Sequence, residues 1–310
     1  MTAPLLAALD LGSNTFRLML ARLGESDLLP GTKRVFQEIP RISEGLTPGG
    51  PLLPAPQQRA LAVLDSFQKI ILAEDPQRVL AGCTMFARLA SNGPQFMAQI
   101  AARYDWIPWI LRGEEEAHLA ALGVLHDLDP VPKTGLIFDI GGRSTEFIHT
   151  LDKKLLSYQS LPFGVVGLTE TYIHHDPPEE KELQNLSKAI LNFLKEANFS
   201  KDFTTLIGTA GTVTTIAATL LKLDDYSPEK IQNSLLTKEQ ISALFEELKI
   251  TLLDSRARPG LHPRRADVIL AGLLIVLNCL DFFQKDTLVV SDSGLLEGLW
   301  LYTAGLVTIP

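Results

Sequence analysis

The sequence predicts an α/β protein made of two domains that share one design. Two apolar runs, 5–9 and 135–138, each end in an aspartate that is followed by a glycine-rich turn carrying hydroxyl side chains. The first turn is Asp10-Leu-Gly-Ser-Asn-Thr15 and the second is Asp139-Ile-Gly-Gly-Arg-Ser-Thr-Glu146. An apolar run that stops at a glycine turn is typical of a buried strand. Two starts of the same kind therefore predict a duplicated α/β fold.

The elements expected after each start follow one plan. In the first half, strands are predicted near 5–9, 16–22, 34–38, 78–82 and 106–111, with helices at 56–74 and 114–126. In the second half, strands are predicted from 136 to about 148 and at 154–160, with helices at 165–173, 179–197, 211–222 and 238–254. The polar, proline-bearing segment 127–135 is the expected linker. We therefore expect domains at 1–127, completed by a C-terminal helix at 298–310, and at 128–297.

Composition limits the class of protein. The net charge of −8 argues against broad affinity for nucleic acid or for an anionic membrane. The apolar stretch 268–280 is shorter than the roughly 20 residues that a bilayer requires, so a buried helix is expected there. No export signal precedes the first strand, which favours a cytoplasmic location. Cys83 and Cys279 have apolar neighbours and are expected to be buried rather than bonded.

Both turns have the composition of a phosphate clamp. Glycines such as Gly12, Gly141 and Gly142 let backbone N–H groups approach an anion closely, and polar side chains add donors. Those side chains belong to Ser13, Asn14, Thr15, Ser144 and Thr145. Two such turns that face each other would hold a phosphate from both sides.

Three carboxylates accompany the clamp. Asp10, Asp139 and Glu146 can hold a divalent cation against phosphate oxygens. Asp10 by itself is equally compatible with a simple turn cap. Asp139 and Glu146 lie seven positions apart around a glycine turn, so a tight hairpin would return both to one edge of the sheet.

Eight blocks of the chain resemble the exopolyphosphatase / guanosine pentaphosphate phosphatase family, within the actin, sugar-kinase and chaperone-ATPase superfamily. The blocks occur in the family's order at 10–17, 84–92, 113–117, 139–146, 161–170, 208–212, 265–272 and 290–298. The chain looks like a short form without the C-terminal extension of longer members. The resemblance implies two ribonuclease-H-like domains facing across a cleft. It also implies Mg²⁺- or Mn²⁺-dependent hydrolysis of the terminal phosphoanhydride of inorganic polyphosphate.

The resemblance selects a catalytic base. Hydrolysis needs a group that orients and deprotonates water, and the run Glu114-Glu115-Glu116 offers three acids. Such a run also suits a helix N-terminus, where the helix dipole stabilises negative charge. By the family's pattern the base is Glu116, with Glu115 as second choice.

The same pattern assigns arginines to the phosphate. Arg17 and Arg143 would flank it together with the polar turn residues, Arg88 matches a phosphate-contacting arginine, and Arg265 belongs to a family block. Two positions depart from the pattern. Arg143 stands where a third glycine is usual, and Gly167 stands where an arginine is usual. An arginine lost at one position and regained at the other would either conserve the charge that faces the substrate or alter the preference for chain length or nucleotide.

Two further segments allow more than one interpretation. The turn formed by Gly208, Thr209, Gly211 and Thr212 precedes an apolar helix, and either binds a phosphate through helix N-terminal amides or is a purely structural turn. The loop 256–265 contains four arginines. In an acidic protein it is a candidate polyanion track, with a solvated loop as the alternative.

Other functions remain open at this stage. Removal of the 5′-phosphate from guanosine pentaphosphate uses the same chemistry on a nucleotide. A non-catalytic nucleotide-binding sensor would share the fold, since fold does not fix function. The sequence also leaves a homodimer open.

Overall fold

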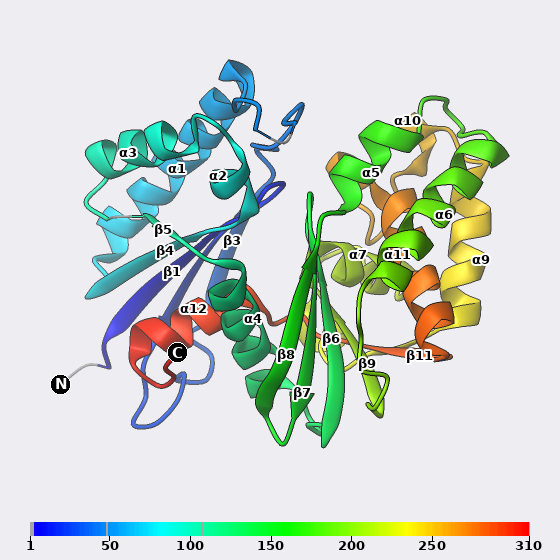
Figure 1. The fold of residues 1–310 in the computed structure, drawn as a ribbon. Coiled ribbons are helices and arrows are strands. Elements are labelled where there is room, and N and C mark those ends of the chain that lie inside the picture. The colour runs from blue at the N-terminus through cyan, green and yellow to red at the C-terminus, as the bar shows by residue number, and fades with distance from the viewer. Residues whose placement is uncertain (1–2, 48, 107, 310) are drawn as a thin grey trace. The chain divides into compact units, whose positions relative to one another are not determined.

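The structure, a computed structural model, describes residues 3–47, 49–106 and 108–309. The chain divides into two compact units, Met1–Gly123 with Gly294–Pro310, and Val124–Ser293. Each unit is an α/β domain with its own sheet and its own hydrophobic core (Figure 1). Helix α4 (Gly113–Asp127) begins in the first unit and ends in the second.

The first unit is built on a five-stranded sheet with the order β3-β2-β1-β4-β5. Its strands are β1 (Leu5–Leu11), β2 (Phe16–Arg22), β3 (Arg34–Glu38), β4 (Arg78–Cys83) and β5 (Pro108–Ile110). The first three strands form an antiparallel meander, whereas β4 and β5 run parallel to β1 and to each other. Every residue of β1 is buried. The functional turn after β1 therefore starts from a rigid, fully covered strand.

Helices cover both faces of this sheet (Figure 1). They are α1 (Pro54–Glu74), α2 (Met85–Leu89), α3 (Gly93–Arg103), the first part of α4, and α12 (Leu295–Ala304). Buried side chains of α1 and α3, such as Phe67 and Ile100, join the strand residues in the core. Helix α12, from the C-terminal end of the chain, packs on β1 and β4.

Helices α4 and α12 cross at a contact that requires glycine. A Cβ atom added to Gly298 would lie 1.9 Å from the carbonyl oxygen of Leu119, and one added to Gly123 would lie 2.0 Å from that of Gly294. Any side chain at either position would push the two helices apart. The crossing thus fixes α4, which carries Glu116, against a segment from the opposite end of the chain.

The second unit repeats the strand plan of the first. Its six-stranded sheet has the order β10-β11-β9-β6-β7-β8. The strands are β6 (Thr134–Ile140), β7 (Thr145–Leu151), β8 (Lys154–Leu161), β9 (Thr205–Thr209), β10 (Leu235–Thr237) and β11 (Thr287–Val290). Again three strands form an antiparallel meander and the next two, β9 and β11, continue in parallel. This shared order is the ribonuclease-H-like plan, which confirms the expected fold class.

A layer of helices packs around one central helix in this unit. The helices are α5 (Val165–Tyr172), α6 (Glu180–Glu196), α7 (Ala210–Leu220), α8 (Pro228–Ile231), α9 (Lys238–Lys249), α10 (Leu253–Arg256), the 3₁₀ turn η1 (Pro263–Arg265) and α11 (Ile269–Phe283). Helix α11 contacts α5, α6, α7 and α9, which explains why it is apolar on nearly all sides. Within the described residues, no helix is both long and apolar enough to cross a membrane.

The structure corrects the end of one predicted helix and confirms the burial of the two cysteines. The helix predicted at 238–254 is wrong at its end, because α9 stops at Lys249 and Leu252 is extended before the short α10 begins. A capping box starts this helix, since Thr237 Oγ1 accepts from the amide of Gln240. Cys83 and Cys279 are buried and unbonded, as expected, and burial raises the pKa of both thiols.

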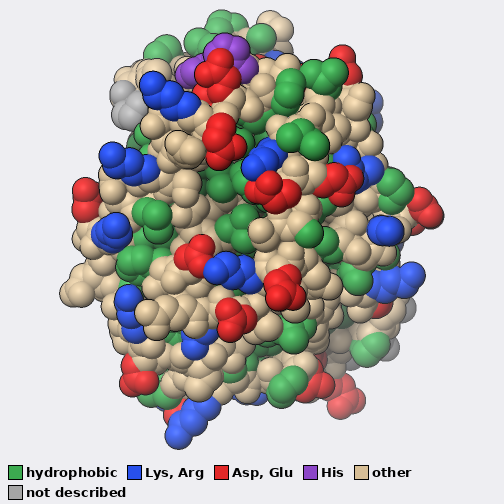
Figure 2. All heavy atoms as spheres, turned by 90° about the vertical axis from the view of Figure 1, so that its right-hand side faces the viewer, with side chains coloured by type: hydrophobic (Ala, Val, Ile, Leu, Met, Phe, Trp, Pro, Cys, Tyr) green, Lys and Arg blue, Asp and Glu red, His purple; other side chains and the backbone are tan. Residues whose placement is uncertain are grey.

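A histidine–carboxylate pair links α6 to the segment before it. His175 Nδ1 lies 3.0 Å from Glu182 Oε1, and the same carboxylate accepts hydrogen bonds from the amides of His174 and Glu179. Figure 2 shows histidine side chains beside acidic ones at the top of one face. Burial alone would raise the pKa of Glu182, but these hydrogen bonds outweigh it and lower the pKa to about 2. The hydrogen bond to Glu182, helped by the charge of Glu179, raises the pKa of His175.

This pair should give the fold a pH-dependent contribution. The contribution of Glu182 is present above its ordinary pKa of 4.5 and is lost as the pH falls toward about 2. That of His175 is present below its ordinary pKa of 6.5 and is lost as the pH rises through its raised value. We therefore expect His175→Ala to lower the melting temperature between about pH 4.5 and 6.5 and to have little effect at pH 9. His174→Ala is the matched control, and an equal loss at both pH values would contradict the pairing.

Candidate active site

Each unit begins with the same glycine hairpin, and the strand register places two functional residues opposite each other. In the first unit the amide of Gly12 donates to the carbonyl of Thr15 at 3.0 Å, and Asp10 is paired with Arg17 across β1 and β2. In the second unit the amide of Gly141 donates to the carbonyl of Ser144 at 2.9 Å, and Asp139 is paired with Glu146 across β6 and β7. Residues directly opposite in an antiparallel ladder project to the same face.

The first hairpin is held by its carbonyl groups, which leaves its amides available. The carbonyl oxygens of Ser13 and Asn14 accept hydrogen bonds of 3.1 Å from the amides of Ser43 and Arg41. No hydrogen bond joins the amides of Ser13, Asn14 or Thr15 to another part of the chain that the structure describes. A turn whose carbonyls are tied back and whose amides point elsewhere is suited to bind an anion.

The second hairpin is anchored in the same way by a different element. The amide of Val165 donates to the carbonyl of Gly141 at 3.1 Å, and that of Val166 donates to the carbonyl of Gly142 at 2.9 Å. Gly164 must be glycine, because a Cβ there would lie 2.4 Å from the carbonyl oxygen of Gly141. The first turn of α5 therefore fixes the hairpin through the hairpin's carbonyl groups.

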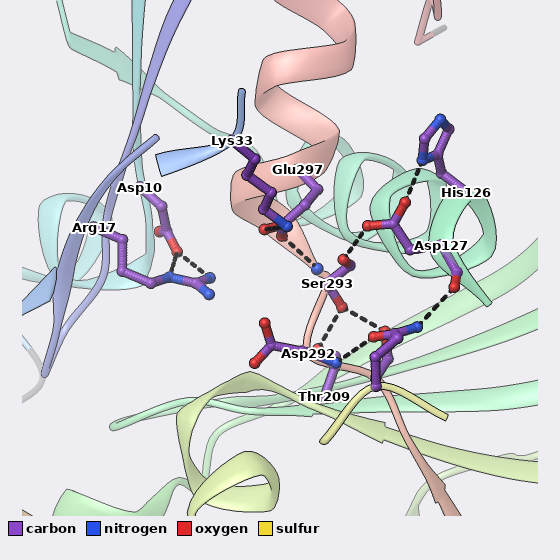
Figure 3. Close-up of polar contacts among 12 residues, drawn as sticks. Asp10, Arg17, Lys33, His126, Asp127, Thr209, Asp292, Ser293 and Glu297 are labelled. Atoms are coloured by element: carbon purple, nitrogen blue, oxygen red, sulfur yellow. Dashed lines mark hydrogen bonds and ion pairs between the residues drawn. The ribbon is translucent and has the colours of Figure 1, made fainter. Parts of the chain in front are cut away.

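Asp10 combines burial with an ion pair. Its Oδ2 accepts from Arg17 Nη2 at 2.7 Å and from Nε at 3.1 Å, while its buried Oδ1 has no hydrogen-bond partner (Figure 3). Burial raises the pKa of Asp10, which outweighs the lowering by Arg17, and the negative charge of Glu297 adds to the rise. Glu297 itself is buried in α12 and forms a 3.0 Å ion pair with Lys33. Neither Glu297 nor Lys33 was predicted from the sequence as a site residue.

Asp139 and Glu146 have a polar neighbour, Ser160, that was not predicted from the sequence. Ser160 stands opposite Glu146 on β8, and its hydroxyl donates to Glu146 Oε1 at 2.7 Å. Asp139, Glu146 and Ser160 therefore form a row across three adjacent strands. Ser160 therefore fixes the orientation of the Glu146 carboxylate.

Glu116 and Arg88, which were predicted for different roles, contact each other. Glu116 Oε2 accepts from Arg88 Nη2 at 2.9 Å and from Nη1 at 3.0 Å. Arg88 Nη1 also donates to the carbonyl of Leu111, at the end of β5. Because Leu11, Cys83 and Ile110 are paired in register, β1, β4 and β5 end at one edge of the first sheet. Asp10 and the Arg88–Glu116 pair are therefore near that common edge.

Glu115 has a local structural role. Its Oε2 accepts from the amide of Arg112 at 2.7 Å, and its Oε1 accepts from Arg112 Nε at 3.0 Å. This is how an acid at the third helical position caps the N-terminus of a helix. The neighbouring Glu114 is exposed, whereas Glu116 is buried.

The third turn brings a predicted arginine to a predicted glycine. A Cβ on Gly211 would lie 2.1 Å from Arg265 Nη1, so the guanidinium lies directly on the start of α7. Ala210, at the same turn, has a left-handed backbone with φ of 68°, which is strained for a residue other than glycine. Thr209 Oγ1 donates to the carbonyl of Ser293 at 2.8 Å, which ties β9 to the segment before α12 (Figure 3).

The proposed polyanion track in the loop 256–265 is wrong for its first two arginines. Arg256 is 3% exposed and donates to the carbonyls of Ala266 and Thr251 at 3.1 and 2.8 Å. Arg258 pairs with Glu247 and donates to the carbonyl of Arg256. Both side chains hold the loop together instead of facing a substrate. Figure 2 shows basic and acidic side chains interspersed on this face of the second unit.

Arg143 fills the space above Gly167. A Cβ on Gly167 would lie 3.6 Å from both Cδ and Nη1 of Arg143, and Arg143 Nη2 forms a 2.6 Å ion pair with Glu170. The guanidinium that the sequence carries at position 143 therefore lies beside position 167. The two departures from the family pattern are thus spatially linked.

Two glycine hairpins of one design, each with neighbouring carboxylates, are compatible with a phosphate-processing α/β protein. The profile of the Ppx/GppA phosphatase family matches residues 34–305, and the chain belongs to that family. It is accordingly a hydrolase that acts on phosphoanhydride bonds.

Relatives of known name span the described fold. The chain is 30% identical over 306 residues to a bifunctional 3-dehydroquinate synthase/phosphatase of Fusobacterium nucleatum, covering 94% of this chain but only 45% of that relative. It is 28% identical to exopolyphosphatase 2 of Mycobacterium tuberculosis, covering 96% of this chain and 98% of the relative.

Solved structures agree with this placement. The Ppx/GppA enzyme of Aquifex aeolicus has a TM-score of 0.81 at 31% identity, over 96% of this chain and 99% of its own. An exopolyphosphatase from Cytophaga hutchinsonii has a TM-score of 0.88 at 25% identity, over 97% and 98% of the two chains.

An exchange of residues tests whether the guanidinium beside Gly167 binds phosphate. We expect Arg143→Gly to weaken orthophosphate binding about tenfold or more, since hydrogen bonds to charged groups contribute about 1.5–3 kcal/mol. The double variant Arg143→Gly with Gly167→Arg should regain most of that affinity, measured by calorimetric titration. Gly167→Ala is the control, because its Cβ would make only ordinary contacts. A double variant no better than Arg143→Gly would contradict the assignment.

Proposed function

We propose that this chain releases orthophosphate from the terminus of inorganic polyphosphate. The observation that carries the proposal is the duplicated glycine hairpin, whose carbonyls are tied back in both units and whose amides in the first unit are available to phosphate oxygens. The family of phosphatases to which the chain belongs, and the exopolyphosphatases among its relatives, support the substrate class. A cytoplasmic location and any self-association stay predictions.

The carboxylates of both units fit a hard divalent cation, Mg²⁺ or Mn²⁺. Asp10 Oδ1 is a buried oxygen without a hydrogen-bond partner, which suits a cation ligand. Asp139 and Glu146 add two carboxylates on one face of the second sheet. Within the described residues, no three His, Cys, Asp or Glu side chains gather into a metal site. Mg²⁺ usually takes one or two carboxylates and completes its shell with water and phosphate oxygens.

The chemistry proposed is direct attack by water. Glu116 would orient the water and take its proton as the oxygen bonds to the terminal phosphorus and the bond to the bridging oxygen breaks. The hairpin amides and Arg17, Arg88 and Arg143 would bind the phosphoryl oxygens, on which charge accumulates. Bound Mg²⁺ would neutralise part of that charge. The products are orthophosphate and a polyphosphate that is one unit shorter.

A phosphate-release assay tests the substrate. Polyphosphates of several lengths and guanosine pentaphosphate would be compared at equal concentration of termini, with Mg²⁺ and with EDTA. We expect phosphate release from polyphosphate to depend on Mg²⁺ and to be at least as fast as release from guanosine pentaphosphate. Faster release from guanosine pentaphosphate would make the nucleotide the substrate, and no release from either would overturn the proposal.

Removing the proposed base should separate binding from turnover. Glu116→Gln keeps an acceptor for Arg88, so we expect KM for polyphosphate to stay within a few-fold while kcat falls on the order of 10²–10⁴-fold, the usual contribution of a general base. Glu114→Gln is the matched control, because Glu114 is exposed in the same helical turn. Turnover by Glu116→Gln within a few-fold of wild type would exclude Glu116 as the base.

A further inference from the structure

Two carboxylates of the first unit each hold an arginine that the proposed function assigns to the phosphate. Asp10 holds Arg17 at 2.7 Å, and Glu116 holds Arg88 at 2.9 Å. The charge of Arg17 opposes a cation at the other oxygen of Asp10, Oδ1, and Arg88 occupies Oε2 of Glu116. Neither arginine is fully available to a substrate. The two ion pairs therefore belong to the protein without substrate, and substrate binding must rearrange them.

Burial explains why the pairs exist before a substrate arrives. The side chains of Asp10 and Glu116 are each 10% exposed, and removing an ionised carboxylate from water is costly unless a cation compensates it. Their partners are more accessible, with 18% exposure for Arg17 and 25% for Arg88. Each pair therefore consists of an inner anion and an outer cation.

The register makes the Asp10–Arg17 pair easy to exchange. Arg17 stands directly opposite Asp10 on the neighbouring strand, so side-chain rotation is enough to form or break the pair. Arg88 has a second acceptor in the carbonyl of Leu111, which can retain the guanidinium when it leaves Glu116. Both arginines can thus turn to an anion without backbone movement.

We propose that Arg17 and Arg88 are exchangeable counter-ions: phosphate takes both guanidinium groups, which removes the positive charge that opposes a divalent cation at Asp10 and frees Glu116 for water. This inference rests on the proposed function and adds a coupling between its two ligands. Phosphate draws Arg17 away and so favours the cation at Asp10. By thermodynamic reciprocity, the cation favours phosphate by the same factor.

The decisive experiment measures Mg²⁺ binding without phosphate. If Arg17 is a counter-ion that competes with the metal, Arg17→Gln should bind Mg²⁺ more tightly than wild type, by about fivefold or more, the lower range of typical coupling. Calorimetric titration gives the dissociation constant. If Arg17 instead supports the metal site, the same substitution weakens Mg²⁺ binding. Unchanged or weaker Mg²⁺ binding by folded Arg17→Gln overturns the inference.

Three further measurements complete the design. Saturating orthophosphate should tighten Mg²⁺ binding by wild type, and this effect should shrink in Arg17→Gln. Arg88→Gln should weaken orthophosphate binding and leave Mg²⁺ binding unchanged, because Glu116 is not a proposed ligand. Arg103→Gln, which breaks an ion pair with Asp65 on the surface, should change neither constant.

If Arg17→Gln fails to fold, the Mg²⁺ titrations of the wild-type protein with and without orthophosphate still test the inference. An equal Mg²⁺ dissociation constant with and without orthophosphate in wild type overturns the inference. These titrations involve no turnover, so they are independent of the assay for the proposed function. Coupling without phosphate release would refute the substrate alone, and release without coupling would refute the exchange alone.

Discussion

The antiparallel hairpin closed by a glycine amide is the constraint on which the rest of the site depends. The bond from Gly12 to Thr15, or from Gly141 to Ser144, fixes the register of the two strands that flank the turn. That register alone decides which residue stands opposite each aspartate. It also decides that the turn presents amides, because neighbouring segments hold its carbonyls. Loss of the hairpin geometry would remove the anion site and the carboxylate arrangement together.

The two hairpins use this common geometry for different charges. In the first unit an arginine stands opposite the aspartate, and the pair is neutral. In the second unit a glutamate stands there, so two negative charges share one face and Ser160 binds one of them. On this account, the first hairpin exchanges its counter-ion for a ligand. The two units therefore share one backbone plan, and the residue opposite the aspartate differs in charge between them.

The sequence was sufficient for features that local chemistry controls and insufficient for those set by long-range contacts. Strands around both glycine turns and the buried helix after residue 268 followed from apolar patterns. The contact of Ser160 with Glu146 could not be predicted in this way. Counting back from the turn between β7 and β8 pairs Glu146 with Gln159, but a register shift between His149 and Thr150 makes Ser160 the partner. Arg256 appeared exposed because its acceptors, such as Ala266, could not be identified from the sequence. The ion pairs of Arg17 and Arg88 were likewise invisible, since burial is not read from spacing.

The most direct test of the account observes the hairpin amides themselves. Backbone ¹H–¹⁵N resonances of the full chain would be followed as orthophosphate is added in the presence of Mg²⁺. Amides that donate to an anion move downfield, so the account predicts such shifts for Ser13, Asn14, Gly142 and Ser144. Downfield shifts confined to other parts of the chain, with these four resonances unchanged, would contradict the claim that the duplicated hairpins bind phosphate.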